Sequence, residues 1–170
     1  MRKILAILLF LSACTTREFK SEELALSYSV EIPKRNKNQI YSHTLEWAYG
    51  RAGFNDISGP GYSSKSEGRF SRRIEMDENI SPLSNESVEM QMSFTIADNR
   101  AEVVFSNPRL VNGGIFVFGA RPRINMEDEL AGYKNLTERV FEEYKTYILT
   151  VPYNPNFDKD TVEMKGQFAE

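Results

Sequence analysis

Apolar and polar side chains alternate along several segments of the chain, a spacing typical of β-strands with one buried face. The first of these segments runs from residue 24 to residue 32 and ends at Pro33. Its apolar positions are Leu24, Leu26, Tyr28, Val30 and Ile32. The alternation predicts a half-buried strand at this place in the chain.

The same alternation returns in the middle of the chain. Residues 88–96 alternate without a break, and Asp98 and Asn99 separate them from a second alternating run at 101–105. Two such runs joined by so short a polar segment predict a tight β-hairpin. Shorter strands are predicted at residues 55–58 and 69–76, between loops that contain glycine and proline.

Two further segments have apolar residues at intervals of three and four, which predicts amphipathic helices. The first covers residues 36–52 and has Gly53 as its predicted C-cap, because glycine adopts the left-handed conformation easily. The second covers residues 126–149 and has Asn125 as its predicted N-cap. Acidic residues fill its first turn, where the helix dipole favours them, and Pro152 prevents its continuation.

The predicted order is strand, helix, several strands, helix. Strands that follow one another directly favour an antiparallel sheet, and helices that do not alternate with strands favour an α+β fold. We predict a sheet of about five strands with both helices on one face, in a single domain at residues 24–150. Residues 151–170 are predicted to form a polar C-terminal tail.

The N-terminus has the pattern of a secretory signal. Arg2 and Lys3 precede the apolar residues 4–11, a run too short to span a bilayer as a helix. The run ends in Leu11-Ser12-Ala13-Cys14, which resembles the lipobox of bacterial lipoproteins. The resemblance implies that residues 1–13 are removed as a signal peptide and that Cys14 carries lipid.

Cys14 is the only cysteine of the chain, so no disulfide or thiolate metal site competes for it. The alternative is an ordinary signal peptide that contains a cysteine. On the lipoprotein interpretation, residues 14–23 form a polar tether and the lipid attaches the protein to a membrane of the cell envelope. Thr15 provides no aspartate-type retention signal, and we expect the outer membrane rather than the inner one.

Charge limits the partners of the mature chain. Removal of Arg2 and Lys3 from the 21 basic residues leaves 19 against 24 acidic ones, a net charge of −5. This balance argues against nucleic acid as a partner, and so does secretion. The 157 residues from Cys14 onward are enough for one domain.

Several packing residues resemble those of a known family. Tyr41 and Trp47 lie on the first predicted helix and are followed by Phe54, by the turn at 65–69 and by the hairpin at 93–105. This combination is similar to a bacterial domain of unknown function with a TATA-binding-protein-like fold, found in secreted and lipid-anchored proteins. The resemblance covers roughly residues 24–110. It implies an architecture only, with neither DNA binding nor catalytic residues.

Candidates for catalysis are few. His43 is the only histidine, which excludes multi-histidine metal sites, and we expect it on the surface of its helix. The sequence contains no nucleophile elbow, phosphate-binding glycine loop or calcium loop. We therefore predict no catalytic, cofactor-binding or metal-binding residues. The alternative is a hydrolase of envelope glycans that uses Glu75 and Asp77 as paired carboxylates.

Candidates for surface binding are Tyr49, Arg69, Arg72 and Arg73. Tyr49 lies off the apolar stripe of its helix, and Arg72 interrupts the apolar alternation of its strand. The arginines suit an acidic glycan or a lipid headgroup, although charged edge strands that resist pairing explain them equally well. We therefore expect a non-enzymatic binding or assembly module of the envelope, with a protein or glycan partner.

Overall fold

The computed structural model describes residues 19–51, 55–56, 62–76, 86–112, 124 and 127–156. The predicted signal peptide, Cys14 and the chain after residue 156 lie outside these ranges. The elements, in chain order, are α2 (Ser21–Leu24), β1 (Leu26–Glu31), α3 (Lys37–Gly50), β2 (Asn55–Asp56), β3 (Ser63–Ser64), β4 (Arg69–Met76), β5 (Glu86–Ala97), β6 (Arg100–Asn112) and α4 (Glu127–Thr150).

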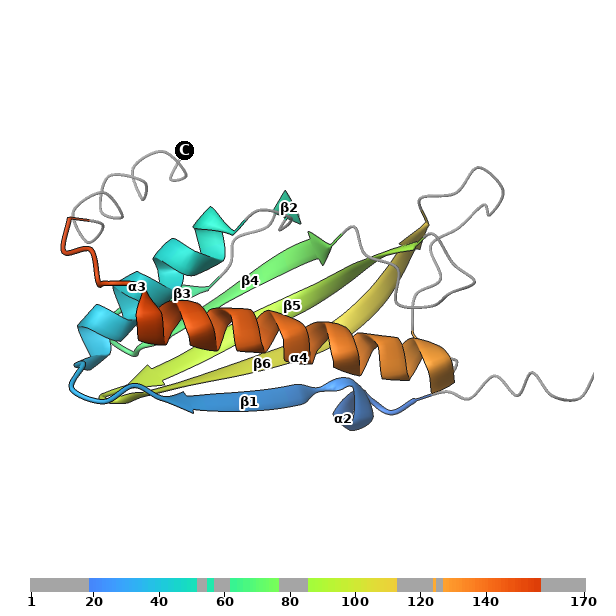
Figure 1. Ribbon diagram of the computed structural model, residues 1–170. Helices are drawn as coiled ribbons and strands as arrows, with labels where there is room; N and C mark the ends of the chain where they lie inside the picture. Colours follow the sequence, from blue (N-terminus) through green and yellow to red (C-terminus); the bar gives the residue numbers. More distant parts are fainter. Residues whose placement is uncertain are drawn as a thin grey trace, which may run out of the picture.

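All described strands belong to one antiparallel sheet (Figure 1). Its order is β1-β6-β5-β4-β2, and the two-residue strand β3 also pairs with β4. The hairpin predicted at Asp98 and Asn99 joins β5 to β6, with Ala97 opposite Arg100. Asn99 has a φ of 60°, a left-handed conformation that asparagine tolerates in tight turns. The α+β prediction is therefore confirmed.

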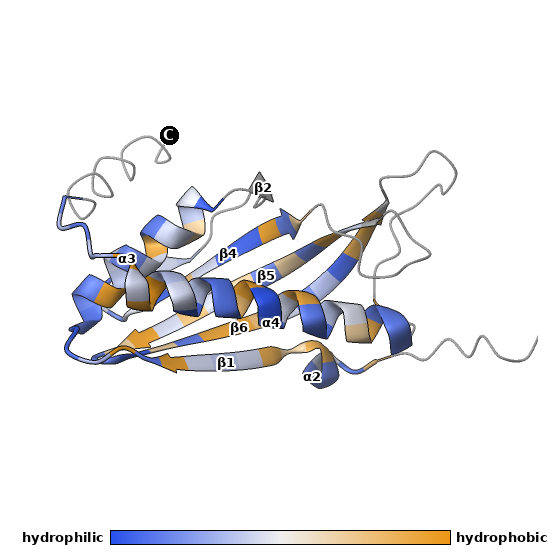
Figure 2. Cartoon of the chain, viewed as in Figure 1, coloured by the Kyte–Doolittle hydropathy of each residue, from blue (hydrophilic) through white to orange (hydrophobic). Residues whose placement is uncertain are grey.

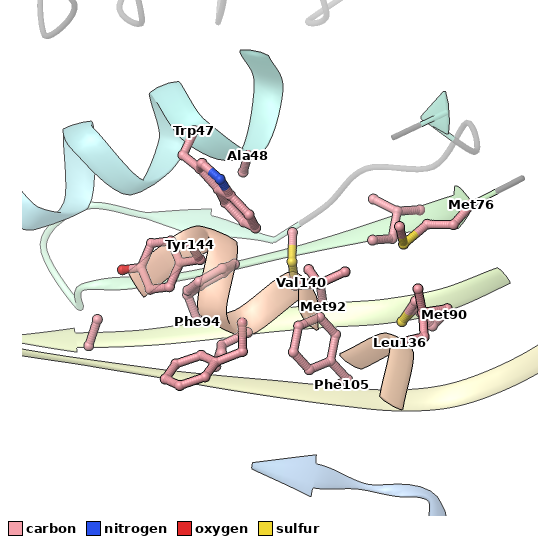
Figure 3. Close-up of a cluster of buried hydrophobic side chains, with 14 of the residues drawn as sticks. Trp47, Ala48, Met76, Met90, Met92, Phe94, Phe105, Leu136, Val140 and Tyr144 are labelled. Atoms are coloured by element: carbon pink, nitrogen blue, oxygen red, sulfur yellow. The ribbon is translucent and has the colours of Figure 1, made fainter. Parts of the chain in front are cut away.

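Helices α3 and α4 lie on the same face of the sheet (Figure 1). Alternate residues of the strands point toward them, and the resulting alternation of polar and apolar residues along β4, β5 and β6 is visible in Figure 2. Aromatic rings fill the layer between helices and sheet (Figure 3). Phe94 of β5 stacks on Phe70 at a centroid distance of 4.6 Å and meets Tyr144 of α4 at 5.3 Å. Trp47 of α3 lies 5.0 Å from the same Tyr144 ring, so one aromatic cluster joins α3 and α4 to strands β4 and β5.

The boundaries of α3 follow from its capping groups. The Asn36 side chain accepts a hydrogen bond from the Gln39 backbone N–H at 3.0 Å, and the Gln39 side chain accepts one from the Asn36 N–H at 3.1 Å. This reciprocal capping box fixes the first turn. The helix ends at Gly50, and the backbone N–H of Arg51 bonds to Trp47 O at 3.0 Å. The predicted C-cap at Gly53 is therefore wrong, because the chain is already extended at Arg51.

The ordered domain begins before the predicted boundary at Leu24. Phe19 is only 3% exposed and belongs to the hydrophobic core. Ser21–Leu24 forms the helical turn α2, which packs against β6, and Leu24 is buried within it. The first strand consequently starts at Leu26. Residues 19–23 were predicted as tether because they are polar apart from Phe19, whose ring is buried in the core together with Leu24.

Strand β6 contains a bulge. Glu89 pairs with Arg109, but Gln91 pairs with Ser106, so β6 has one residue more than β5 in this interval. Asn107 has a φ of 52°, the left-handed conformation that one kind of bulge requires. Buried positions are odd-numbered before the bulge and even-numbered after it, as at Leu110. No helix in the described part of the chain is long and apolar enough to cross a membrane.

Candidate functional site

The four predicted surface residues do not form one patch. Arg72 points to the helix side of the sheet and is only 7% exposed, in the same alternation as Phe70 and Ile74. Its guanidinium donates to Ala48 O and lies 4.5 Å from the centre of the Tyr49 ring. Ala48 is in the last turn of α3, where carbonyls lack helical partners and a cation is favourable. The prediction of Arg72 as a surface residue is therefore wrong.

Tyr49 is 53% exposed, in agreement with its predicted surface position. The Arg72 guanidinium beneath its ring holds it at the edge of the domain through a cation–π contact. Tyr62 is similarly exposed, and its hydroxyl donates to Glu67 at 2.5 Å. A binding role for Tyr49 stays a prediction.

Arg69 and Arg73 lie on the other face of β4, the face that α3 and α4 leave open. Arg73 forms an ion pair with Glu89 of β5, and its side chain is 47% exposed. Most of the rest of this open face is polar as well, with Val104 and Val111 as apolar members. Its members on β5 and β6 include Gln91, Ser93, Thr95, Glu102, Ser106, Asn107 and Arg109.

A groove of about 480 Å³ lies on the open face at the bulge of β6. The sheet contributes Arg73, Gln91, Asn107, Pro108 and Arg109 to its lining, and the N-terminal segment contributes Phe19, Ser21 and Leu24. We call it the arginine groove. The Asn107 amide donates to Gln91 Oε1 at 3.3 Å. Within the described ranges, the side chain of Arg109 makes no hydrogen bond or ion pair.

Sequence reasoning found Arg73 but missed the other polar members of this groove. The signal in the sequence was Asn107-Pro108, because proline inside a strand pattern indicates an edge or a bulge. The bulge adds one residue to β6 and so places Arg109 on the open face. The groove also needs Phe19 and Leu24, whose position no local pattern predicts.

The carboxylates of the open face have structural partners. Glu75 accepts a hydrogen bond from Ser87 Oγ at 2.5 Å. Its cross-strand neighbour is Glu89, which pairs with Arg73. Asp77, the other carboxylate of the hydrolase hypothesis, lies outside the described residues. Over the ranges that are described, there is no group of three or more side chains arranged to hold a metal ion.

His43 is fully buried, so its predicted surface position is wrong. Its Nδ1 lies 2.6 Å from an Arg35 guanidinium nitrogen, and because arginine only donates, Nδ1 accepts and the ring is neutral with its proton on Nε2. Burial first, and the Arg35 charge second, lower the pKa of His43 to about 4. The Nε2 atom has no hydrogen-bond partner among the described residues.

Arg35 connects His43 to the end of α4. Its guanidinium donates to Ile148 O at 2.8 Å and to Val151 O at 3.3 Å. These carbonyls belong to the C-terminal end of the helix, where a cation is stabilising. The arrangement therefore joins the β1–α3 loop to the end of α4, and we assign it a structural role.

The chain matches no family model, and no curated protein matches it at significant similarity. Solved structures with a similar fold include the following two. A TBP-like protein from Parabacteroides distasonis superposes with a TM-score of 0.59 at 16% identity, over 77% of this chain and 96% of that one. A DUF4468 family protein from Bacteroides ovatus superposes with a TM-score of 0.53 at 12% identity, over 84% of this chain and 94% of that one.

These likenesses define the class of the domain. It has a TATA-binding-protein-like fold, as the packing residues and the hairpin predicted. The names of the two neighbours state a fold and a family without an activity. At these identities the likeness concerns the fold alone, and function has to be argued from the residues of this chain.

Proposed function

We propose that the protein is a lipid-anchored module of the bacterial cell envelope that binds a partner through the open face of its sheet and performs no catalysis. One observation supports the binding role: α3 and α4 cover one face of the sheet and leave open a largely polar face that contains the arginine groove. A groove with a few convergent polar groups is the usual form of a ligand site. The partner is an envelope component, because the chain carries a secretion signal.

The anchoring role is supported by the N-terminal sequence. The positive start, the apolar run and Leu11-Ser12-Ala13-Cys14 together resemble a lipoprotein precursor. Stable attachment needs more than one acyl chain, and lipoprotein processing supplies a diacylglyceryl group and a further acyl chain on the same cysteine. We place the protein in the outer membrane rather than the inner one.

The non-catalytic role is supported by what the acids of the open face do. Glu75 is held by Ser87, Glu89 by Arg73, and Glu102 accepts a hydrogen bond from Ser27 at 2.9 Å. These carboxylates are spread over the surface of the sheet, and each forms a hydrogen bond or an ion pair with a neighbouring side chain. Glycoside hydrolysis needs two carboxyl groups that face each other across a bound sugar.

Anchoring is tested by metabolic labelling with a fatty acid. We expect the wild-type chain to take up label and to fractionate with membranes, and Cys14→Ala to do neither. Thr16→Ala, close by in the same segment, is the matched control and should behave as wild type. A labelled and membrane-bound Cys14→Ala variant would show that the anchor is elsewhere.

Binding through the open face is tested by placing a photo-crosslinking residue at Ser106, beside the arginine groove. The control position is Glu138, which is exposed on α4. We expect crosslinks to an envelope component from Ser106 and none from Glu138. Equal crosslinking from both positions, or crosslinking from Glu138 alone, contradicts the assignment of the open face.

A further inference from the structure

We infer that the arginine groove binds the phosphate of an anionic lipid headgroup in the membrane that carries the anchor. The inference rests on the proposed lipidation of Cys14 and adds a ligand and an orientation to it. In this arrangement the open face of the sheet turns toward the bilayer, and α3 and α4 point away from it.

The polar groups of the groove suit a phosphate. Arg73 and Arg109 each present a planar guanidinium, which binds phosphate oxygens through paired N–H donors. Gln91 accepts from Asn107, which leaves the amide N–H groups of Gln91 to donate to a ligand. The volume of about 480 Å³ lies within the usual range for small-ligand sites, which is about 300–1,000 Å³.

The described residues that line the groove carry two positive charges, those of Arg73 and Arg109. Glu89 lies opposite Arg109 in the sheet and forms its ion pair with Arg73, and no carboxylate is among the described residues that line the groove. The Arg109 guanidinium has no hydrogen-bond or ion-pair partner in the described part of the chain, so its charge is available to an anion. Glu23 of α2 accepts a hydrogen bond from the Lys20 backbone N–H and does not line the groove either.

The position of the groove selects a membrane lipid over other anions. Phe19 lines the groove and is fixed in the core, and it follows Cys14 by only five residues. Five residues span at most about 18 Å when fully extended. A lipidated Cys14 therefore holds the groove within that distance of the headgroups, which raises their effective concentration far above that of a free anion.

The test uses the full chain, purified from bacterial membranes as processed by the cell. The protein is reconstituted in vesicles of phosphatidylcholine with or without phosphatidylglycerol, and amide hydrogen exchange is measured by mass spectrometry. We expect exchange in residues 19–24 and 106–109 to be slower with phosphatidylglycerol. Arg109→Gln should abolish this difference. Lys134→Gln, which removes a cation exposed on α4, should retain it.

A second arm uses inorganic phosphate with the same protein in neutral detergent. We expect protection of the same residues, with the half-maximal phosphate concentration about tenfold higher in Arg109→Gln, as the loss of one charged hydrogen-bond partner implies. Protection by phosphate without any effect of phosphatidylglycerol overturns the headgroup assignment. Equal protection on both vesicles, or no protection in either arm, overturns it as well.

The mass of the N-terminal peptide separates this inference from the proposed function. An acylated Cys14 without a phosphatidylglycerol effect leaves the anchor in place and removes only the headgroup site. An unacylated Cys14 removes both the anchor and the reason to assign the anion to the membrane.

Discussion

His43 should make the stability of the domain depend on pH. The ring is fully buried and neutral, and its Nδ1 accepts a hydrogen bond from Arg35 at 2.6 Å. Burial, with a further contribution from the Arg35 charge, lowers the pKa of His43 to about 4 from an ordinary value of 6.5. As the only histidine of the chain, it is also the only side chain with an ordinary pKa in this range.

The magnitude follows from linkage between protonation and unfolding. Between the two pKa values the unfolded state binds more protons than the folded state, so the free energy of unfolding falls as the pH is lowered through 6.5. The contribution of His43 to this loss is about 2 kcal/mol at about pH 5 and about 3 kcal/mol at about pH 4. Further acidification adds little, because both states are then protonated at this residue.

The measurement is urea unfolding between about pH 7 and about pH 4, followed by tryptophan fluorescence. Trp47 is the only tryptophan and is 6% exposed, so it reports on the loss of the core. The comparison is with His43→Gln, whose amide oxygen can still accept from Arg35 but does not titrate. Carboxylates titrate in both proteins, and subtraction of the two curves isolates the histidine.

We expect the stability difference between wild type and His43→Gln to move in favour of the variant as the pH falls. A difference that stays constant over this range would refute the assignment of a buried neutral ring. A pH-independent part of the difference, added to the pH-dependent part, reports the packing change caused by the substitution.

Three further predictions use matched substitutions and the same unfolding assay. Tyr144→Phe removes the hydroxyl that lies 2.9 Å from Thr44 Oγ1 and should lower the free energy of unfolding by about 1 kcal/mol. Tyr133→Phe should leave this free energy unchanged or raise it, because the Tyr133 hydroxyl has no partner among the described residues. Gly68→Ala should lower the free energy of unfolding by about 1–3 kcal/mol, because φ at Gly68 is +66° and a Cβ would overlap a backbone carbonyl of β5. Gly50→Ala is the matched control: its Cβ would meet open space, and it should raise the free energy of unfolding by up to about 1 kcal/mol. Arg35→Met removes the cation at the end of α4 and should lower the free energy of unfolding by about 2–4 kcal/mol, and Arg35→Lys should lower it by less. A loss below about 1 kcal/mol for Arg35→Met would contradict the structural role of Arg35.

The strands were predictable because alternation is a local signal. It predicted β4 at the residues where it lies and the hairpin between β5 and β6 at its turn. Arg72 was misinterpreted because its charge was taken as a break in the pattern. Its position in fact continues the inner face, and the carbonyl that satisfies it belongs to a helix far away in the sequence.

His43 was misplaced for a related reason. The apolar stripe of a helix predicts burial when one face packs on the protein. In α3 the six consecutive residues from Ile40 to Leu45 are all buried, because α4 and the segment after it cover the helix in addition to the sheet. Tyr147 of α4 and Tyr153 beyond it contact the His43 ring. Such enclosure depends on tertiary packing and leaves no periodic signal.

The arginine groove could be predicted only in part. A strand pattern indicated that Arg73 points to one face, but the position of Arg109 depends on the bulge, and the other wall depends on where Phe19 packs. The groove brings together residues from four segments of the chain. A sequence read locally identifies some of its members without showing that they meet.

The bulge in β6 sets the phase of everything that follows it in the strand. If the same residues paired in a regular ladder without the bulge, Arg109 and Leu110 would each move by one position in the pleat, so that the arginine would turn into the core and the leucine into solvent. The left-handed conformation at Asn107 thus keeps Leu110 in the core at this end of the sheet and a cation on the open face. The extra residue is absorbed locally, although the segment looks like an ordinary polar interruption in the sequence.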